Sequence, residues 1–224
     1  MLGGLIERFW PSPVANAPAL QRLLSGEASY LAQRSTYEFT RNTLAWFGQH
    51  HFADDRFNEH FRRCRWESFA SLLQAMILIA SARLRPAATG RDAAMVEGLA
   101  AICANALAEY PLPAHRPEGW SDVVEQLRDR LALDEAPDAR RLATVATKRM
   151  IDVMPVLSSN RDDDFRTIES SIQFGLIAFA DRLPRRLDPP ALIADLARPM
   201  AKAGAADAGI NTLPPHAIRC RALP

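Results

Sequence analysis

Cysteine and lysine are scarce in this chain of 224 residues. The three cysteines, Cys64, Cys103 and Cys220, show no pairing pattern, so they do not indicate a disulfide framework and a reducing compartment is expected. Lysine occurs only at Lys148 and Lys202, and the other basic residues are arginines. Basic and acidic residues balance to a formal charge of +1, which argues against a general nucleic-acid binder because such proteins carry a basic surplus.

A hydrophobic run long enough to cross a membrane is also missing. The most apolar segment, residues 69–82, would span about 21 Å as a helix, whereas the hydrocarbon core of a bilayer is about 30 Å thick. No secretory signal is predicted, because Glu7 and Arg8 interrupt the apolar run that Leu5 and Ile6 begin. The expected location is cytoplasmic, with peripheral attachment at the inner membrane surface as an open alternative.

Motifs of the common enzyme classes are absent from the sequence. There is no G-x-S-x-G nucleophile turn, no G-x-G-x-x-G dinucleotide loop and no G-x-x-x-x-G-K-[ST] phosphate loop. No cofactor is therefore predicted. The chain is interpreted as non-enzymatic, with an enzyme kept as the alternative.

Helix-forming residues dominate what is present. The chain has 38 alanines and 26 leucines, against 26 valines, isoleucines and threonines taken together. Alanine and leucine suit helices, and no run of useful length alternates with period two. We therefore predict an all-α fold: a bundle of six or seven helices over residues 19–200, with an amphipathic arm at 1–18 and an irregular tail at 201–224. Residues 55–85 are predicted to form a buried central helix, because 69–82 is apolar on every side.

Several helix starts are predicted from capping patterns. Thr89 with Asp92 resembles a capping box, and Asp188 before two prolines is typical of a helix start. The acidic run 162–164 is interpreted as the first turn of a helix that begins near Phe165, because carboxylates there are favoured by the helix dipole. Asp54 is expected to cap the central helix.

The N-terminal arm has one apolar face. Its large apolar residues recur at i, i+3, i+4, i+7 and i+8: Leu2, Leu5, Ile6, Phe9 and Trp10. So short a segment does not form a stable helix alone in water, so it needs a surface to lie on. Its own bundle, another protein and a membrane are the three alternatives. We interpret the arm as a partner-binding element, with membrane binding second.

Two groups of arginines are candidate anion-binding sites. The first group lies on one helix face, and the second is interleaved with Phe61 and Trp66: Arg34, Tyr37 and Arg41, then Arg62, Arg63 and Arg65. Guanidinium groups bind phosphate and carboxylate in two-point fashion. The alternative for both groups is a solvated helix face, with Glu38 pairing with Arg34 and Arg41 in the first.

Potential metal ligands cluster before the central helix, at His50, His51, Asp54, Asp55 and Glu59. Their spacing matches no metal motif, so a polar turn is the favoured interpretation and no metal is predicted. The run from Asp54 to Asn58 resembles the aspartate-rich motif of all-α isoprenoid synthases. The second motif of that family is not matched at 160–169, because Asp164 and Ile168 stand where serine and a carboxylate are needed.

The sequence thus predicts a protein-binding adaptor, accessory or regulatory subunit of a larger assembly. A protein partner or a second copy of the chain is the expected partner. The alternative is a bundle that encloses an isoprenoid-like or quinone-like ligand, as a carrier or an enzyme. A cavity lined by Phe69, Met76, Phe174 and Phe179 would favour that alternative, and a filled core would favour the first.

Overall fold

The computed structural model describes residues 13–47, 53–133, 136–155 and 160–198, with only the backbone described for 42–47. Seven α-helices form within these ranges: α2 (Ala17–Phe47), α3 (Asp55–Leu84), α4 (Asp92–Ala108), α5 (Ser121–Ala132), α6 (Ala139–Ile151), α7 (Arg161–Arg182) and α8 (Pro189–Leu196). They confirm the predicted all-α bundle. The arm residues 1–12 and the tail from 199 onward lie outside the described residues.

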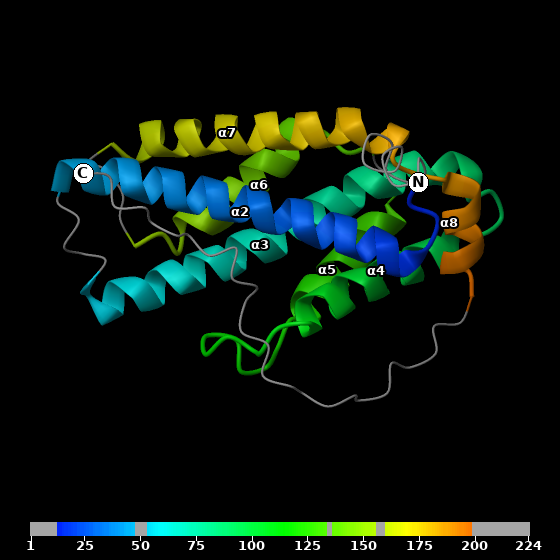
Figure 1. Cartoon of the computed structure of the whole chain (residues 1–224), viewed down its shortest axis with the longest axis horizontal. Coiled ribbons are helices and arrows are strands. Elements are labelled where there is room, and N and C mark those ends of the chain that lie inside the picture. The colour runs from blue at the N-terminus through cyan, green and yellow to red at the C-terminus, as the bar shows by residue number, and fades with distance from the viewer. Residues whose placement is uncertain (1–12, 48–52, 134–135, 156–159, 199–224) are drawn as a thin grey trace, which may run out of the picture.

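Helix α3 is the centre of the bundle, and the other helices pack around its C-terminal half (Figure 1). Every residue from Glu67 to Ser81 is buried, which confirms the expected burial of 69–82 except at the half-exposed Ala82. By length and mean hydropathy the segment Asp55–Ala87 could cross a membrane, but 89% of its most apolar window is buried inside the protein. That burial is the pattern of a core helix.

Helices α2 and α7 run side by side along one face of the bundle (Figure 1). The chain before α2 is fixed to the turn that joins α7 to α8: the Val14 amide donates to the Arg186 carbonyl at 2.7 Å, and Val14 accepts from the Asp188 amide at 3.0 Å. This isolated bridge is the one β-type pairing among the described residues. It sets where the N-terminal segment joins the bundle.

The helix starts agree with the capping predictions except at α4. The side chains of Asp54, Asn160 and Asp188 each accept a hydrogen bond from a backbone amide in the first turn of their helix. The prediction of a capping box at Thr89 and Asp92 is wrong. Helix α4 begins at Asp92, its N-cap residue is Arg91, and no side chain caps it. Gly90 adopts a φ of 76° just before it, which closes a turn and moves the helix start past Thr89.

Candidate functional site

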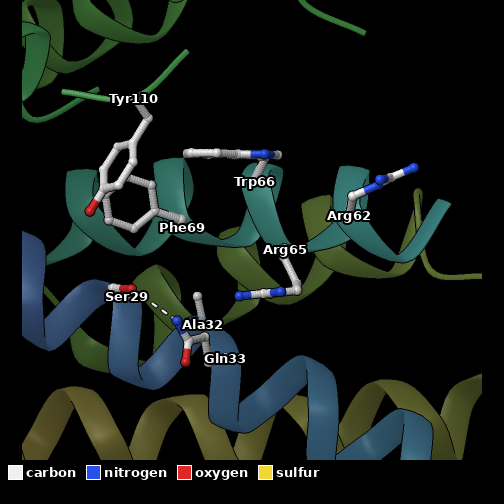
Figure 2. Close-up of a pocket in the computed structure, with 8 residues that line it drawn as sticks. All are labelled: Ser29, Ala32, Gln33, Arg62, Arg65, Trp66, Phe69 and Tyr110. Atoms are coloured by element: carbon white, nitrogen blue, oxygen red, sulfur yellow. Dashed lines mark hydrogen bonds between the residues drawn. The ribbon is translucent and has the colours of Figure 1, made fainter. Parts of the chain in front are cut away.

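A pocket lies between α2 and the N-terminal half of α3, and the segment after α4 closes one side of it (Figure 2). We call it the arginine–aromatic pocket. Its volume is about 130 Å³, and it is lined by Ser29, Ala32, Gln33, Arg62, Arg65, Trp66, Phe69 and Tyr110. The four residues from α3 recur at i, i+3, i+4 and i+7, so they share one face of that helix.

Three aromatic rings form the apolar wall of this pocket. The centroids of Trp66 and Tyr110 are 5.3 Å apart, and Phe69 lies 6.1 Å from each of them, all in edge-to-face geometry. Edge-to-face pairs at these separations stabilise one another. The aromatic wall is therefore held in place by its own packing before any ligand arrives.

Arg65 places a positive charge in this pocket, and no acidic side chain among the described residues pairs with it. Figure 2 shows its side chain extending from α3 towards Ala32 and Gln33 of α2, whereas Arg62 points away from the rings. Arg65 is half-buried, and burial lowers the pKa of its guanidinium. Neither arginine forms a hydrogen bond or an ion pair with the described residues. A charge removed from water without a partner destabilises the fold, so an incoming anion would be favoured here.

The predicted cluster of Arg62, Arg63 and Arg65 is divided by the helix. Successive residues on a helix are rotated by about 100°, so Arg63 points away from its two neighbours. It lines a separate polar cleft of about 560 Å³ that also contains Glu67. Phe61, which the sequence placed in the same cluster, stacks on Phe57 at 6.2 Å and does not line the pocket.

Glu67 is the centre of that polar cleft and is almost fully buried, with a side chain 6% exposed. Arg116 donates to both of its carboxylate oxygens, from Nε at 2.8 Å and from Nη2 at 3.0 Å. Arg149 Nε donates to Oε2 at 2.7 Å, and His115 Nε2 lies 3.0 Å from Oε1. These bonds connect α3 with the loop before α5 and with α6.

Arg116 and Arg149 keep Glu67 in its charged form. Burial alone would raise that pKa, but the hydrogen bonds and charges of Arg116 and Arg149 outweigh burial and lower it to about 2. Burial lowers the pKa of His115, and this outweighs the opposite effect of its hydrogen bond to Glu67. A general base needs a pKa near the working pH, so Glu67 is a fixed anion that clamps three elements and not a proton acceptor.

The other predicted residues do not form a common site. Arg34 pairs with Glu38 at 3.3 Å on the surface of α2, as the solvated-face alternative expected. Tyr37 is half-buried and Arg41 is exposed, and neither lines a described pocket with Arg34. The five apolar residues of the arm lie outside the described residues.

The candidate metal ligands are spread along the start of α3. Asp54 accepts a hydrogen bond from the Arg56 amide at 2.8 Å as the helix cap, and Asp55 and Glu59 are exposed. His50 and His51 lie outside the described residues. Within the described ranges, no group of three histidine, cysteine, aspartate or glutamate side chains is placed to hold a metal.

The cavity that an enclosed apolar ligand would need is not formed by the four residues proposed to line it. Met76 and Phe179 are packed in the core, Phe69 faces the arginine–aromatic pocket, and Phe174 is 73% exposed on α7. Among the described residues these four therefore do not line a common cavity.

Sequence reasoning missed Tyr110, Glu67, Arg116 and Arg149 as parts of these two sites. One signal was present in the sequence. Glu67 stands one turn or less before the apolar run 69–82, and a carboxylate so close to a buried segment needs a partner. Its partners stand 49 and 82 residues away, and helical spacing cannot reveal contacts over such separations. Comparison of the chain with protein-family models, with curated proteins and with solved structures gave no match.

Proposed function

We propose that this chain is a non-enzymatic helical protein that works by binding a protein partner, and that the arginine–aromatic pocket receives an acidic group of that partner. The observation that carries the proposal is the half-buried guanidinium of Arg65, which has no acidic partner among the described residues. Carboxylates and phosphates bind guanidinium groups through charge-assisted hydrogen bonds, which are stronger than neutral ones.

The composition of the pocket defines the group that it fits. Arg65 supplies the charge, while Trp66, Phe69 and Tyr110 offer an apolar surface next to it. The hydroxyl of Ser29 accepts a hydrogen bond from the Gln33 amide at 3.4 Å, so polar atoms of α2 line the opposite side. A ligand group that carries an acid next to an aromatic or aliphatic side chain would contact both the guanidinium and the aromatic wall.

The size of the pocket favours a protein over a free apolar ligand. Sites for complete small molecules have volumes of about 300–1,000 Å³. The arginine–aromatic pocket, at about 130 Å³, has room for one side chain or one terminal residue. The rest of the ligand would lie outside, as it does when one anchor residue of a partner enters a pocket at an interface.

A selection from displayed random peptides tests this proposal. The library offers both internal segments and free carboxyl ends to the full-length protein. Selected peptides are expected to share an acidic group beside an apolar residue. Arg65→Met should weaken their binding by at least about tenfold, because a charge-assisted hydrogen bond contributes about 1.5–3 kcal/mol.

Arg63→Met is the matched control, because it removes the same charge one residue away but outside the pocket. It should leave the affinity within about twofold of the original. Selected peptides without an acidic group, or peptides that bind the Arg65→Met variant equally well, would contradict the proposal.

A further inference from the structure

A second groove runs along the outer face of α2, and it begins where the described chain begins. Its volume is about 650 Å³, and its apolar lining consists of Val14, Ala19, Leu23, Gly26 and Tyr30. From Ala19 to Tyr30 these residues recur at i, i+4, i+7 and i+11, so they form one stripe along the helix. The groove shares no lining residue with the arginine–aromatic pocket.

This stripe is open along its length. Tyr30 is 63% exposed, although it is a large aromatic residue. A side-chain carbon built at Gly26 would meet no atom within 4 Å, so another backbone can approach the helix there. The rim is charged: Glu27 pairs with Arg182 at 3.0 Å, whereas Arg22 has no ion pair among the described residues.

We propose that the N-terminal arm of the same molecule occupies this groove, as a helix that lies antiparallel to α2. Twelve residues precede Pro13, and Val14 is fixed beside the groove by its bridge to the α7–α8 turn. The arm therefore begins its course at one end of the groove. As a helix, residues 2–10 would be about 12 Å long, and the stripe on α2 from 19 to 30 is about 17 Å long.

The arm is shorter than the stripe and would cover it from Ala19 to Gly26, where the two faces match in chemistry. In an antiparallel hairpin that places Trp10 at the level of Ala19, Ile6 meets Leu23 and Gly3 comes to the level of Gly26. The largest arm residue is then opposite a small one, and two glycines permit close approach of the helices. In the same register Glu7 comes to the level of Arg22, which gives that arginine an acidic partner.

This arrangement separates the arm from the proposed partner site. The apolar face of the arm would be covered by its own bundle, so it would not be free to anchor a protein or a membrane. The inference does not depend on what the arginine–aromatic pocket binds.

A cysteine pair on the rim tests the inference without removing any apolar contact. Glu7→Cys and Arg22→Cys are introduced together into a Cys220→Ser background. Cys64 and Cys103 can remain, because both are buried and burial raises the pKa of each thiol to about 12. Mild oxidation of the dilute protein is followed by mass analysis of the monomer. We expect an internal disulfide, formed at least about tenfold more than in the control pair Glu7→Cys with Glu125→Cys, because docking raises the effective concentration of the two thiols.

A further variant separates docking from chance contact. Ile6→Asp, added to the rim pair, places a charge in the apolar face of the arm and should reduce the internal disulfide to the level of the control pair. Equal yields in the rim and control pairs would overturn the inference. A covalent dimer as the main product would also overturn it, because the arm would then occupy the groove of a second copy.

Discussion

Replacing Glu67 with glutamine tests whether the buried carboxylate clamps α3, α6 and the loop before α5. The substitution keeps the shape of the side chain and removes its charge, while Arg116 and Arg149 remain. The pKa of Glu67 is lowered from its usual 4.5 to about 2, which corresponds to about 3 kcal/mol of stabilisation of the charged form. We therefore expect the free energy of unfolding at neutral pH to fall by about 3 kcal/mol.

The change of the unfolding free energy with pH provides a second test of the role of Glu67. Because the folded pKa of Glu67 lies below its unfolded value, its contribution is complete above about pH 4.5 and is lost as the pH falls towards 2. The lowered pKa of His115 acts in the same direction. The fold favours the neutral form of His115, so this stabilisation is present above pH 6.5, the ordinary pKa of histidine, and is lost as the pH falls. Glu67→Gln should therefore lose less stability than the original protein between pH 5 and pH 3.

Urea unfolding, followed by circular dichroism at neutral and acidic pH, measures both effects. Asp122→Asn is the control, because Asp122 binds Arg116 at 2.8 Å but is 49% exposed, so its loss should cost less than about 1 kcal/mol. A Glu67→Gln variant within about 0.5 kcal/mol of the original, with the same acid dependence, would refute the assignment of Glu67 as a clamp.

Four further outcomes are expected. Arg65→Met should leave the melting temperature unchanged or raise it, because it removes a half-buried charge that has no acidic partner in the described part of the chain; thermal unfolding measures this. Ile77→Asp should prevent folding, since Ile77 is fully buried and an unpaired buried carboxylate costs several kcal/mol; circular dichroism would show the loss of helix. Gly98→Ala should destabilise the protein by about 1–3 kcal/mol in urea unfolding, because its new carbon would lie 2.8 Å from a leucine of α8. Cys64 and Cys103 should react with a thiol reagent at pH 8 only after unfolding, because burial raises the pKa of both thiols to about 12.

The helices could be predicted from the sequence because they depend on local patterns. Residues 69–82 are apolar on every side, and a helix with that pattern has to be surrounded by other helices. The Thr89–Asp92 cap failed for an equally local reason: the positive φ of Gly90 takes the chain through a turn first. The predicted helix start was therefore two residues too early.

The site could be predicted only in part, because its halves are far apart in the chain. Helical rotation alone separates Arg63 from Arg62 and Arg65, and that division could have been read from their spacing. Tyr110 lies in the segment after α4, and its contact with Trp66 depends on how the helices pack. Glu59 and Glu67 both stand near Arg65 in the sequence, so only the fold shows that no described acidic side chain pairs with it.

The indole resonance of Trp66 offers the most direct measurement of binding in the arginine–aromatic pocket. The protein, labelled with ¹⁵N at its tryptophans, is titrated with N-acetylphenylalanine, a residue-sized acid, and separately with its uncharged amide. Trp66→Phe identifies the resonance. We predict a saturable shift of the Trp66 signal with the acid, a much weaker shift with the amide, loss of the shift in Arg65→Met and its retention in Arg63→Met. Equal responses to acid and amide, or no response to either, would contradict the assignment of this pocket as an acid-binding site.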